Sequence, residues 1–420
     1  MGMLVMAGKW ANVLQECAFG GVPSPAADAL FPVANLIDGV PGREFAFASA
    51  PLACNVIYDL DKLGTDGGFE AGTLGSLWLD QSTPNGVVAV VSTGTPNSGT
   101  YHAKLNSTAS GTAMVTLVKE VKTGRRYRFQ LKAKCPSGGS SMVKFIILNV
   151  ESGKYLQVGG TWGASPVEIS TASTTYVAIE RNFAVEGFAA LGGKDTCVLW
   201  IQIHGVTNVN ADCYIDDARL WPEVDTVAIF GNNILPGQVP QVRFGNDATT
   251  FATWLGSLTP LRPAMYTTFA TSTQRYLQVI FNPSAGSVEG NIRIGELWAG
   301  QAFVPPRAVS AVSGAPEVSV SRRQIVSDFQ TFALSDYPVT SLNLPMHLLT
   351  GANYKDFRNE IIERSLGSRY PLVIVPDDVL EPDLVVMGKL PGAQAYRRIP
   401  VDQRETVLLV EGLPYATLVA

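Results

Sequence analysis

The sequence predicts a mainly β fold that ends in a small α+β domain. Over most of the first 300 residues, Val, Ile, Tyr, Phe and Thr alternate with polar residues in short runs such as NGVVAVVSTG, SMVKFIILNV and KDTCVLWIQIHG. Gly, Pro, Asn and Ser separate these runs, which is typical of strands in antiparallel sandwiches and jelly rolls. With 420 residues, 46% of them hydrophobic and 16% charged, the chain is long enough for about two or three domains.

Charge and composition exclude several classes of function. The net charge is −5 and no run of basic residues occurs, so nucleic acid is not an expected partner. No apolar segment approaches the roughly 18 residues of a membrane span, so no membrane insertion is expected. The five cysteines show no C-x-x-C spacing, and the first segment, MGMLVMAGKW, lacks the charged start of a signal peptide. These features predict reduced thiols in a protein made in a cytoplasm.

The chain changes character after about residue 300. The segment AGQAFVPPRAVSAVSGAP predicts an extended connector, because each Pro disfavours helix at the residue before it. NYKDFRNEIIERSLG predicts a helix with Phe357, Ile361 and Ile362 on one face, and strands are expected in YPLVIVPDD, PDLVVMGKL and ETVLLVEGL. We therefore expect residues 301–420 to form a linker and an α+β assembly domain.

Two adjacent carboxylates lie in the strand-like segment CYIDDARLW. Strict alternation places Asp216 in an apolar row and Asp217 on the opposite face. A carboxylate that loses water needs a base or a metal ion as its partner. Calcium, with roughly six to eight oxygen ligands, is a candidate, and Glu70 in GGFEAG is a second ligand. The alternative is an aspartate pair that accepts hydrogen bonds from loop amides.

Residues 65–222 resemble carbohydrate-binding modules of the β-jelly-roll kind. The resemblance rests on four blocks in order, GGFEAG, GTYHAKLN, VKTGRRYRFQLKAK and CYIDDARLW. It implies an inserted jelly roll with a structural Ca²⁺ site formed by Gly68, Glu70, Asp216 and Asp217. Either aspartate fits the pattern as the ligand.

Members of this family stack sugar rings on exposed aromatic side chains. Three aromatic residues lie in or beside loop-like sequence, namely Trp78, Tyr101 and Trp162. The resemblance implies carbohydrate binding at these rings. The alternative is that each ring packs in the core or at its rim, as many aromatic side chains do.

The segments on either side of this region resemble two halves of one discoidin-like, galactose-binding-like β-sandwich. ANLIDGVPGREFAF and VIYDL come before the region, and VDTVAIFGNN, RYLQVIF and IRIGELWAG come after it. The resemblance implies that residues 1–64 and 223–300 form a split sandwich. The jelly roll would then be inserted at a surface loop, where insertions are tolerated.

The whole arrangement resembles tail-tip and baseplate proteins of tailed bacteriophages, in which a sandwich ending in GELWAG precedes a Pro-rich linker. It implies a structural protein of the virion, with copies of itself, other tail proteins and host cell-surface glycans as partners. We expect no enzymatic activity, since the sequence contains no G-x-S-x-G, H-E-x-x-H or phosphate-binding loop. The alternative is a secreted or cell-surface carbohydrate-active protein, or an adhesin, with accessory binding modules.

Overall fold

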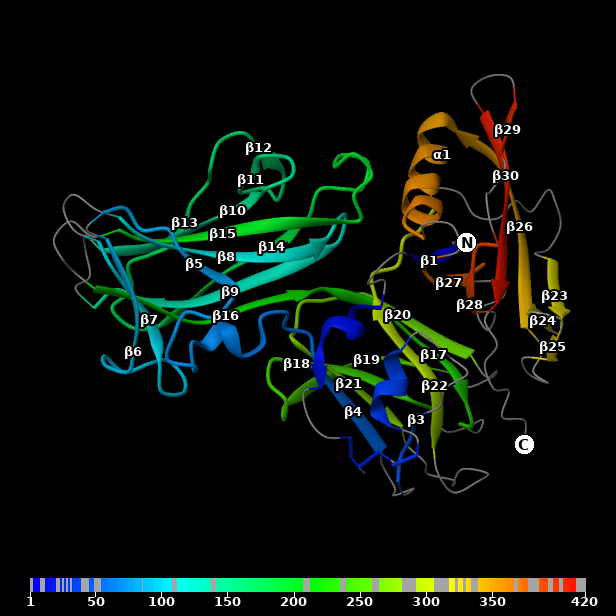
Figure 1. Ribbon diagram of the computed structural model, residues 1–420, viewed down its shortest axis with the longest axis horizontal. Helices are drawn as coiled ribbons and strands as arrows, with labels where there is room; N and C mark the ends of the chain where they lie inside the picture. Colours follow the sequence, from blue (N-terminus) through cyan, green and yellow to red (C-terminus); the bar gives the residue numbers. More distant parts are fainter. Residues whose placement is uncertain are drawn as a thin grey trace. The chain divides into compact units, whose positions relative to one another are not determined.

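A computed structural model of the chain contains two compact units, Asp61–Glu223 and Met1–Leu60 together with Val224–Ala420 (Figure 1). The predicted insertion, 65–222, lies inside the first unit. The structure describes residues 3–7, 12–19, 23–24, 26–27, 29–30, 32–38, 45–48, 54–84, 86–107, 112–136, 141–206, 212–234, 239–258, 264–281, 292–305, 317–321, 324–327, 330–333, 339–365, 369–376, 385–391, 396–399 and 403–412.

The unit Asp61–Glu223 consists of two antiparallel sheets. The first, in spatial order, contains β12 (Trp162–Gly163), β11 (Lys154–Leu156), β10 (Met142–Asn149), β15 (Thr196–Val206), β8 (Ala113–Lys122) and β5 (Trp78–Asp80), with β13 (Ile169–Thr171) beside β10. The second contains β14 (Val177–Ala184), β9 (Arg126–Lys134), β16 (Asp212–Pro222), β7 (His102–Asn106) and β6 (Val87–Val91). We call them the β8–β15–β10 sheet and the β7–β16–β9 sheet.

The connections between these strands make the unit a jelly roll. The chain crosses from one sheet to the other between β7 and β8, β8 and β9, β9 and β10, and again between β14, β15 and β16. The closing strand β16 lies between β7 and β9. Inward-facing residues of both sheets form one core, where the rings of Phe129 and Phe145 meet edge to face at 5.1 Å. The predicted jelly roll is confirmed.

The other unit contains a two-sheet sandwich that the jelly roll interrupts. One sheet contains β20 (Ala264–Ser272), β17 (Val224–Asn232), β22 (Arg293–Gly300) and β3 (Phe45–Ala46). The other contains β19 (Phe251–Ser257), β18 (Gln241–Gly245), β21 (Tyr276–Phe281), β4 (Cys54–Asp59) and β2 (Ala18–Phe19). The rings of Phe244 and Phe269 join the two sheets at 5.4 Å. The strands that flank the jelly roll in the chain, β4 and β17, thus lie in facing sheets of one sandwich.

The C-terminal part adds a further antiparallel sheet and a helix. In spatial order the sheet contains β1 (Leu4–Ala7), β27 (Leu372–Val375), β28 (Val386–Lys389), β30 (Gln403–Gly412), β26 (Val339–Thr350) and β23 (Glu317–Ser321), with β29 (Tyr396–Ile399) beside β30, and β24 (Gln324–Ser327) and β25 (Gln330–Ala333) form a separate hairpin. The helix is α1 (Gly351–Phe357), continued by the π-helical turn η5 (Arg358–Glu363), and Phe357 and Ile361 are fully buried. None of the described helices has the length and apolar character that a membrane span requires. The predicted fold class is confirmed: mainly β, with a small α+β C-terminal part.

The N-terminal strand β1 corrects one predicted boundary. We expected residues 1–64 to belong to the sandwich, but β1 pairs with β27 of the C-terminal sheet. Val5 packs in the core of that sheet and its helix, whereas Leu4 and Met6 pack against Trp298 of the sandwich. Because both faces of β1 are covered, the segment LVMA is apolar at every position. Of the expected linker, the structure describes residues 301–305, where Phe303 forms a bridge with Val5.

Candidate functional site

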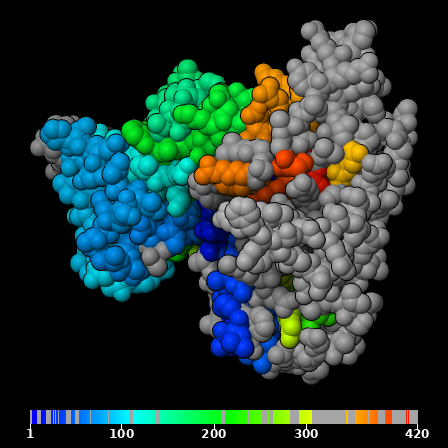
Figure 2. Space-filling model, turned by 45° about the vertical axis from the view of Figure 1, so that its right-hand side comes forward, coloured from blue at the N-terminus to red at the C-terminus, as the bar shows by residue number. Residues whose placement is uncertain are grey.

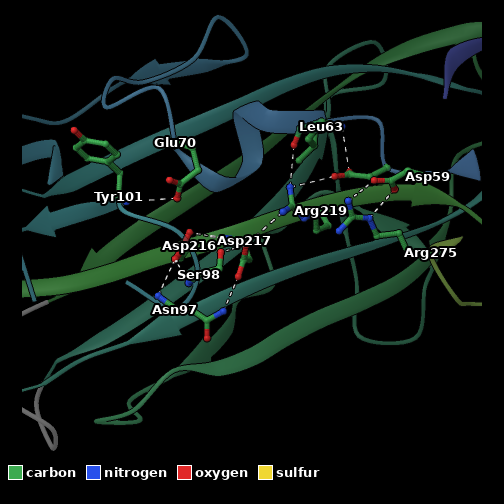
Figure 3. A network of polar contacts seen from close by, with 12 residues as sticks. Asp59, Leu63, Glu70, Asn97, Ser98, Tyr101, Asp216, Asp217, Arg219 and Arg275 are labelled. Carbon is green, nitrogen blue, oxygen red and sulfur yellow. Dashed lines mark hydrogen bonds and ion pairs between the residues drawn. The ribbon is translucent and has the colours of Figure 1, made fainter. Parts of the chain in front are cut away.

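A buried carboxylate on β16 holds the loop between β6 and β7. Asp216 is fully buried. Its Oδ2 accepts hydrogen bonds from the backbone N–H groups of Asn97 (2.9 Å) and Ser98 (3.2 Å), and its Oδ1 accepts one from Asp217 N–H (2.8 Å) (Figure 3). A buried carboxylate needs hydrogen-bond donors, and the N–H groups of this loop supply them. The described contacts are therefore those of the alternative, an aspartate that binds loop amides.

Both aspartates reach this loop because the strand alternation breaks between them. The pairing of β16 with β9 shifts register just after Asp216, and Asp217 has a φ of 46°, in the left-handed region. A bulge of this kind changes which residues share a face. Asp217 accepts hydrogen bonds from Asn97 Nδ2 (2.6 Å) and Ser98 Oγ (2.8 Å). The expectation that the two carboxylates point to opposite faces was therefore wrong.

Glu70 holds the next part of the same loop. It follows the 3-10 turn η3 (Gly64–Gly68), which lies so close to β16 that a Cβ at Gly67 would overlap the backbone of that strand. The Glu70 carboxylate accepts hydrogen bonds from the N–H groups of Thr100 (2.9 Å) and Tyr101 (3.4 Å). All three predicted carboxylates thus bind residues 92–101, which we call the clamped loop (Figure 3).

The carboxylates that were predicted to hold calcium accept hydrogen bonds from the clamped loop. Calcium takes roughly six to eight oxygen ligands, whereas the carboxylate oxygens here accept hydrogen bonds from N–H and O–H groups. Within the described part of the chain, no three His, Cys, Asp or Glu side chains form a group that could hold a metal ion. The described partners of Asp216 and Glu70 are backbone N–H groups. Calcium at Gly68, Glu70, Asp216 and Asp217 stays a prediction, which chelation tests.

A buried lysine holds the carbonyl groups of the clamped loop. Lys134 Nζ donates hydrogen bonds to the carbonyl oxygens of Gly94 and Thr95, the latter at 2.8 Å, and lies 4.4 Å from the centroid of the Tyr176 ring. Burial lowers the pKa of Lys134, and the Asp216 charge opposes this. Burial, reinforced by the neighbouring Asp217 charge, raises the pKa of Asp216 to about 6. Buried groups of both signs therefore hold the loop in place.

His102 lies beneath the clamped loop and contacts its backbone. It is fully buried, with Nε2 at 2.6 Å from the Thr93 carbonyl oxygen and Nδ1 at 2.6 Å from the Tyr176 hydroxyl. The tautomer protonated on Nε2 satisfies both contacts, because it donates to the carbonyl and accepts from the hydroxyl. Burial lowers the pKa of His102, the Thr93 carbonyl raises it, and the Lys134 charge lowers it further.

We expect His102 to make the jelly roll less stable in acid. Because its folded-state pKa is depressed, its contribution to the free energy of unfolding is present above the unfolded value of about 6.5 and is lost as the pH falls below it. The charged and titratable groups that face it are Lys134 on β9, Tyr214 on β16 and Tyr176. Urea unfolding at about pH 7.5 and about pH 5.5 measures the effect.

His102→Gln is the matched variant for this experiment, because glutamine keeps an N–H donor and does not titrate. Its unfolding free energy is expected to fall less between the two pH values than that of the wild type. Contributions from other groups, including Asp216, cancel in this comparison. An equal fall in both proteins would contradict the assignment.

Trp78, predicted to bind sugar, lies in the core. It is 4% exposed, its ring packs on Phe69 at 5.1 Å, and its indole N–H donates to the Asp66 carbonyl oxygen (3.0 Å). A ring covered in this way offers no face to a ligand. The alternative reading, a tryptophan in the core, therefore holds for Trp78.

Trp162 and Tyr101 are half-buried. The indole N–H of Trp162 donates to the Ala184 carbonyl oxygen (2.9 Å), and its ring meets Phe183 edge to face at 6.4 Å. The ring of Tyr101 lies beside Gly72, where an added Cβ would come within 3.4 Å of it. Each ring is fixed by its neighbours, and the structure brings neither residue to the other or to Trp78 through a described contact.

Trp200 was not predicted as a site residue, yet it lies in an apolar row on the outer face of the β8–β15–β10 sheet. The strand register places Val118, Trp200, Leu148 and Tyr155 side by side on four neighbouring strands. All four are half-buried, whereas residues that precede them in the chain, such as Leu117, Ile147 and Leu199, are in the core. The solvated face of an antiparallel sheet is normally polar. We call these four residues the aromatic row.

The next row on the same face contains two polar residues, Thr116 and Gln202, beside Ile146. Thr116 lies opposite Gln202 in the register, and Thr116 Oγ1 donates to Gln81 Oε1 (2.6 Å). One row further, Lys144 lies opposite His204 and forms an ion pair with Glu168 (2.6 Å). In Figure 2 the teal and green part of the chain, which includes strands of both sheets of the jelly roll, lies at the visible surface of the unit. The face therefore combines an apolar strip with adjacent hydrogen-bonding groups.

No family model matches the chain, and no curated protein matches it. A family 61 carbohydrate-binding module in complex with β-1,4-galactotriose is 20% identical and covers 38% of this chain and 96% of its own, with a TM-score of 0.27. A family 16 module is 17% identical over 37% of this chain and 96% of its own (TM-score 0.28). Tailspike protein 4 of bacteriophage CBA120 is 13% identical over 37% of this chain and 21% of its own (TM-score 0.28).

Proposed function

We propose that this chain is a non-enzymatic structural protein that binds glycans through the outer face of its β8–β15–β10 sheet. The observation that carries this proposal is the aromatic row, which sets a tryptophan and a tyrosine on a sheet face next to the polar residues Gln202 and Thr116. A pyranose ring has an apolar face and a rim of hydroxyl groups. The first suits an aromatic ring and the second suits amide and hydroxyl side chains.

Trp200 is better placed for this role than the tryptophans named from the sequence. The indole N–H groups of Trp78 and Trp162 donate to backbone carbonyl groups. Trp200 forms no hydrogen bond with its indole N–H among the residues that the structure describes, and it is half-buried on an outward strand position. Its ring edge is therefore available to a ligand, and Gln202 lies two residues along the same face.

The virion role rests on the sequence resemblance to phage tail-tip and baseplate proteins. A sandwich and a C-terminal sheet that share a core of Trp298, Met6 and Met387 suit a rigid attachment to neighbouring subunits. Copies of this chain and other tail proteins are the partners we propose, with the jelly roll facing host glycans. Many copies on one particle would raise the avidity of a weak sugar contact.

The competing role is a secreted or cell-surface carbohydrate-active protein or adhesin. Glycan cleavage needs two carboxylates about 5 to 10 Å apart across a bond. Asp216 is fully buried and binds three backbone N–H groups, so it does not reach a substrate. Incubation of the chain with glycans that it binds distinguishes the roles, and the appearance of shortened products would favour the carbohydrate-active protein.

Glycan-array binding by the full chain tests the proposed site. Trp200→Ala is expected to weaken binding by about tenfold to thirtyfold, the loss typical of a central aromatic anchor. Trp200→Phe, which keeps a flat ring, should retain most of the affinity. Trp162→Ala is the matched control, a tryptophan that pairs with the core residue Leu156 and so lies on the other strand face from Tyr155.

Unfolding curves of the three variants establish that each one is folded. Binding by folded Trp200→Ala at the wild-type level would remove the aromatic row from the site. Failure of the wild type to bind any glycan on the array would overturn the glycan-binding role itself.

A further inference from the structure

Two buried cysteines face each other between neighbouring strands of the jelly roll. Lys134 on β9 pairs with Tyr214 on β16, so the next positions outward are Cys135 and Cys213. Their Sγ atoms are 3.1 Å apart, and both side chains are fully buried. All five cysteines are described and none of them forms a disulfide, and a contact between two sulfur atoms is described for this pair. The geometry singles out this pair among the thiols of the chain.

The pair is close to the geometry of a disulfide. Directly opposite residues on antiparallel strands have Cβ atoms about 4.5 to 5.5 Å apart, and a disulfide needs about 3.5 to 4.5 Å. Closing the bond brings the sulfur atoms from 3.1 Å to about 2.0 Å. A small side-chain rotation and a slight approach of the two strands accomplish this, without a change of register.

The hydrogen bond between the two thiols suits this reaction. The hydrogen bond from Cys213 lowers the pKa of Cys135, although burial opposes the shift, while the same hydrogen bond and burial raise the pKa of Cys213. Cys135 is therefore the group that becomes a thiolate first. The thiolate is the attacking form in thiol–disulfide exchange.

We propose that Cys135 and Cys213 form a reversible disulfide that fastens the closing strand of the jelly roll when the chain leaves a reducing environment. The oxidant is a low-molecular-weight disulfide such as oxidised glutathione. The Cys135 thiolate attacks one sulfur of the oxidant and releases one glutathione thiolate. The Cys213 thiolate then attacks Cys135 Sγ in the mixed disulfide and releases the second glutathione. The protein gives up two protons and two electrons, and the oxidant is reduced to two thiols.

The pair lies at the ends of two neighbouring strands, which gives the oxidant access to the thiols. Cys135 directly follows β9, and Cys213 is the second residue of β16, so opening of these strand ends exposes both thiols. The residues are 78 positions apart, and a bond between them closes a long loop of the unfolded chain. We expect oxidation to raise the melting temperature of the jelly roll by roughly 5 to 10 °C. This expectation is independent of any glycan binding.

Thiol mapping of the full wild-type chain tests the proposal. The reduced chain is equilibrated with a series of oxidised-to-reduced glutathione ratios, unfolded in N-ethylmaleimide, and digested without reductant. The expected result is one disulfide, between the peptides of Cys135 and Cys213, with Cys17, Cys54 and Cys197 alkylated. Its formation should coincide with the rise in melting temperature, and dithiothreitol should reverse both.

Cys197→Ala is the matched control, a buried cysteine of the same unit that should leave the new bond and the temperature shift unchanged. In Cys135→Ala the shift should disappear. Alkylation of all five cysteines at every glutathione ratio would overturn the proposal, as would a disulfide that joins any other pair. Because the mapping is done on the wild type, a variant that fails to fold leaves this result intact.

Discussion

Val5→Asp is expected to unfold the C-terminal sheet. Val5 is 1% exposed, pairs with Ile374 of β27 and packs in the core that also contains Phe357 of the helix. An aspartate there buries a charge with no partner, which costs about 4 kcal/mol or more. Hydrogen exchange should show the amides of β27 and β28 losing protection, while those of β8 and β15 in the jelly roll keep it.

Val304→Asp is the matched control, because it makes the same chemical change at a residue that is 55% exposed. Its effect on the free energy of unfolding should stay within about 0.5 kcal/mol. If Val5→Asp and Val304→Asp unfold alike, β1 does not belong to the C-terminal sheet. The comparison therefore tests the pairing of β1 with β27.

The fold class followed from the local sequence pattern, whereas the place of β1 did not. Alternation marked the strands of the jelly roll, and the spacing of Phe357 and Ile361 marked the helix. LVMA is apolar at every position, which local pattern does not assign to any particular sheet. Its partner, β27, lies more than three hundred residues away in the chain, and pairing over such a distance leaves no local signal.

The sequence predicted the carboxylates of the candidate site, and one of its two alternatives, loop amides as their partners, agrees with the described contacts. Glu70, Asp216 and Asp217 do meet around one loop. The strand alternation used for the two aspartates fails at a bulge, which a run of strand-forming residues does not reveal. Trp200 was missed because aromatic residues were sought in loops. Its phase relative to buried Leu199 and Ile201 was the signal that pointed to an outward ring.

Asp216→Ala is expected to loosen the clamped loop and destabilise the jelly roll by about 3 kcal/mol or more. The change removes the acceptor of three N–H groups, those of Asn97, Ser98 and Asp217, and each lost hydrogen bond costs about 1 kcal/mol. Asp216→Asn keeps one carbonyl oxygen as an acceptor and should lose less. Urea unfolding gives the free energies, and hydrogen exchange at Asn97 and Ser98 locates the loss.

Asp80→Ala is the control for this series. Asp80 lies on β5 of the same unit, is exposed, and accepts a single hydrogen bond from Ser82 N–H (3.0 Å). Its removal should change stability by about 0.5 kcal/mol or less. An Asp216→Ala protein as stable as Asp80→Ala would show that the clamped loop does not depend on the buried carboxylate.

The same variants decide between loop amides and calcium as the partner of the carboxylates. If N–H groups alone satisfy Asp216 and Glu70, EDTA leaves the wild-type melting temperature unchanged, and Asp216→Ala is destabilised equally with and without it. If an ion is bound, EDTA lowers the wild-type melting temperature, because a ligand that binds only the folded state stabilises it. That decrease must then vanish in Asp216→Ala and Glu70→Ala, since those variants lack the ligands. The described hydrogen bonds favour the first outcome, and a metal-dependent shift confined to the wild type would reverse that conclusion.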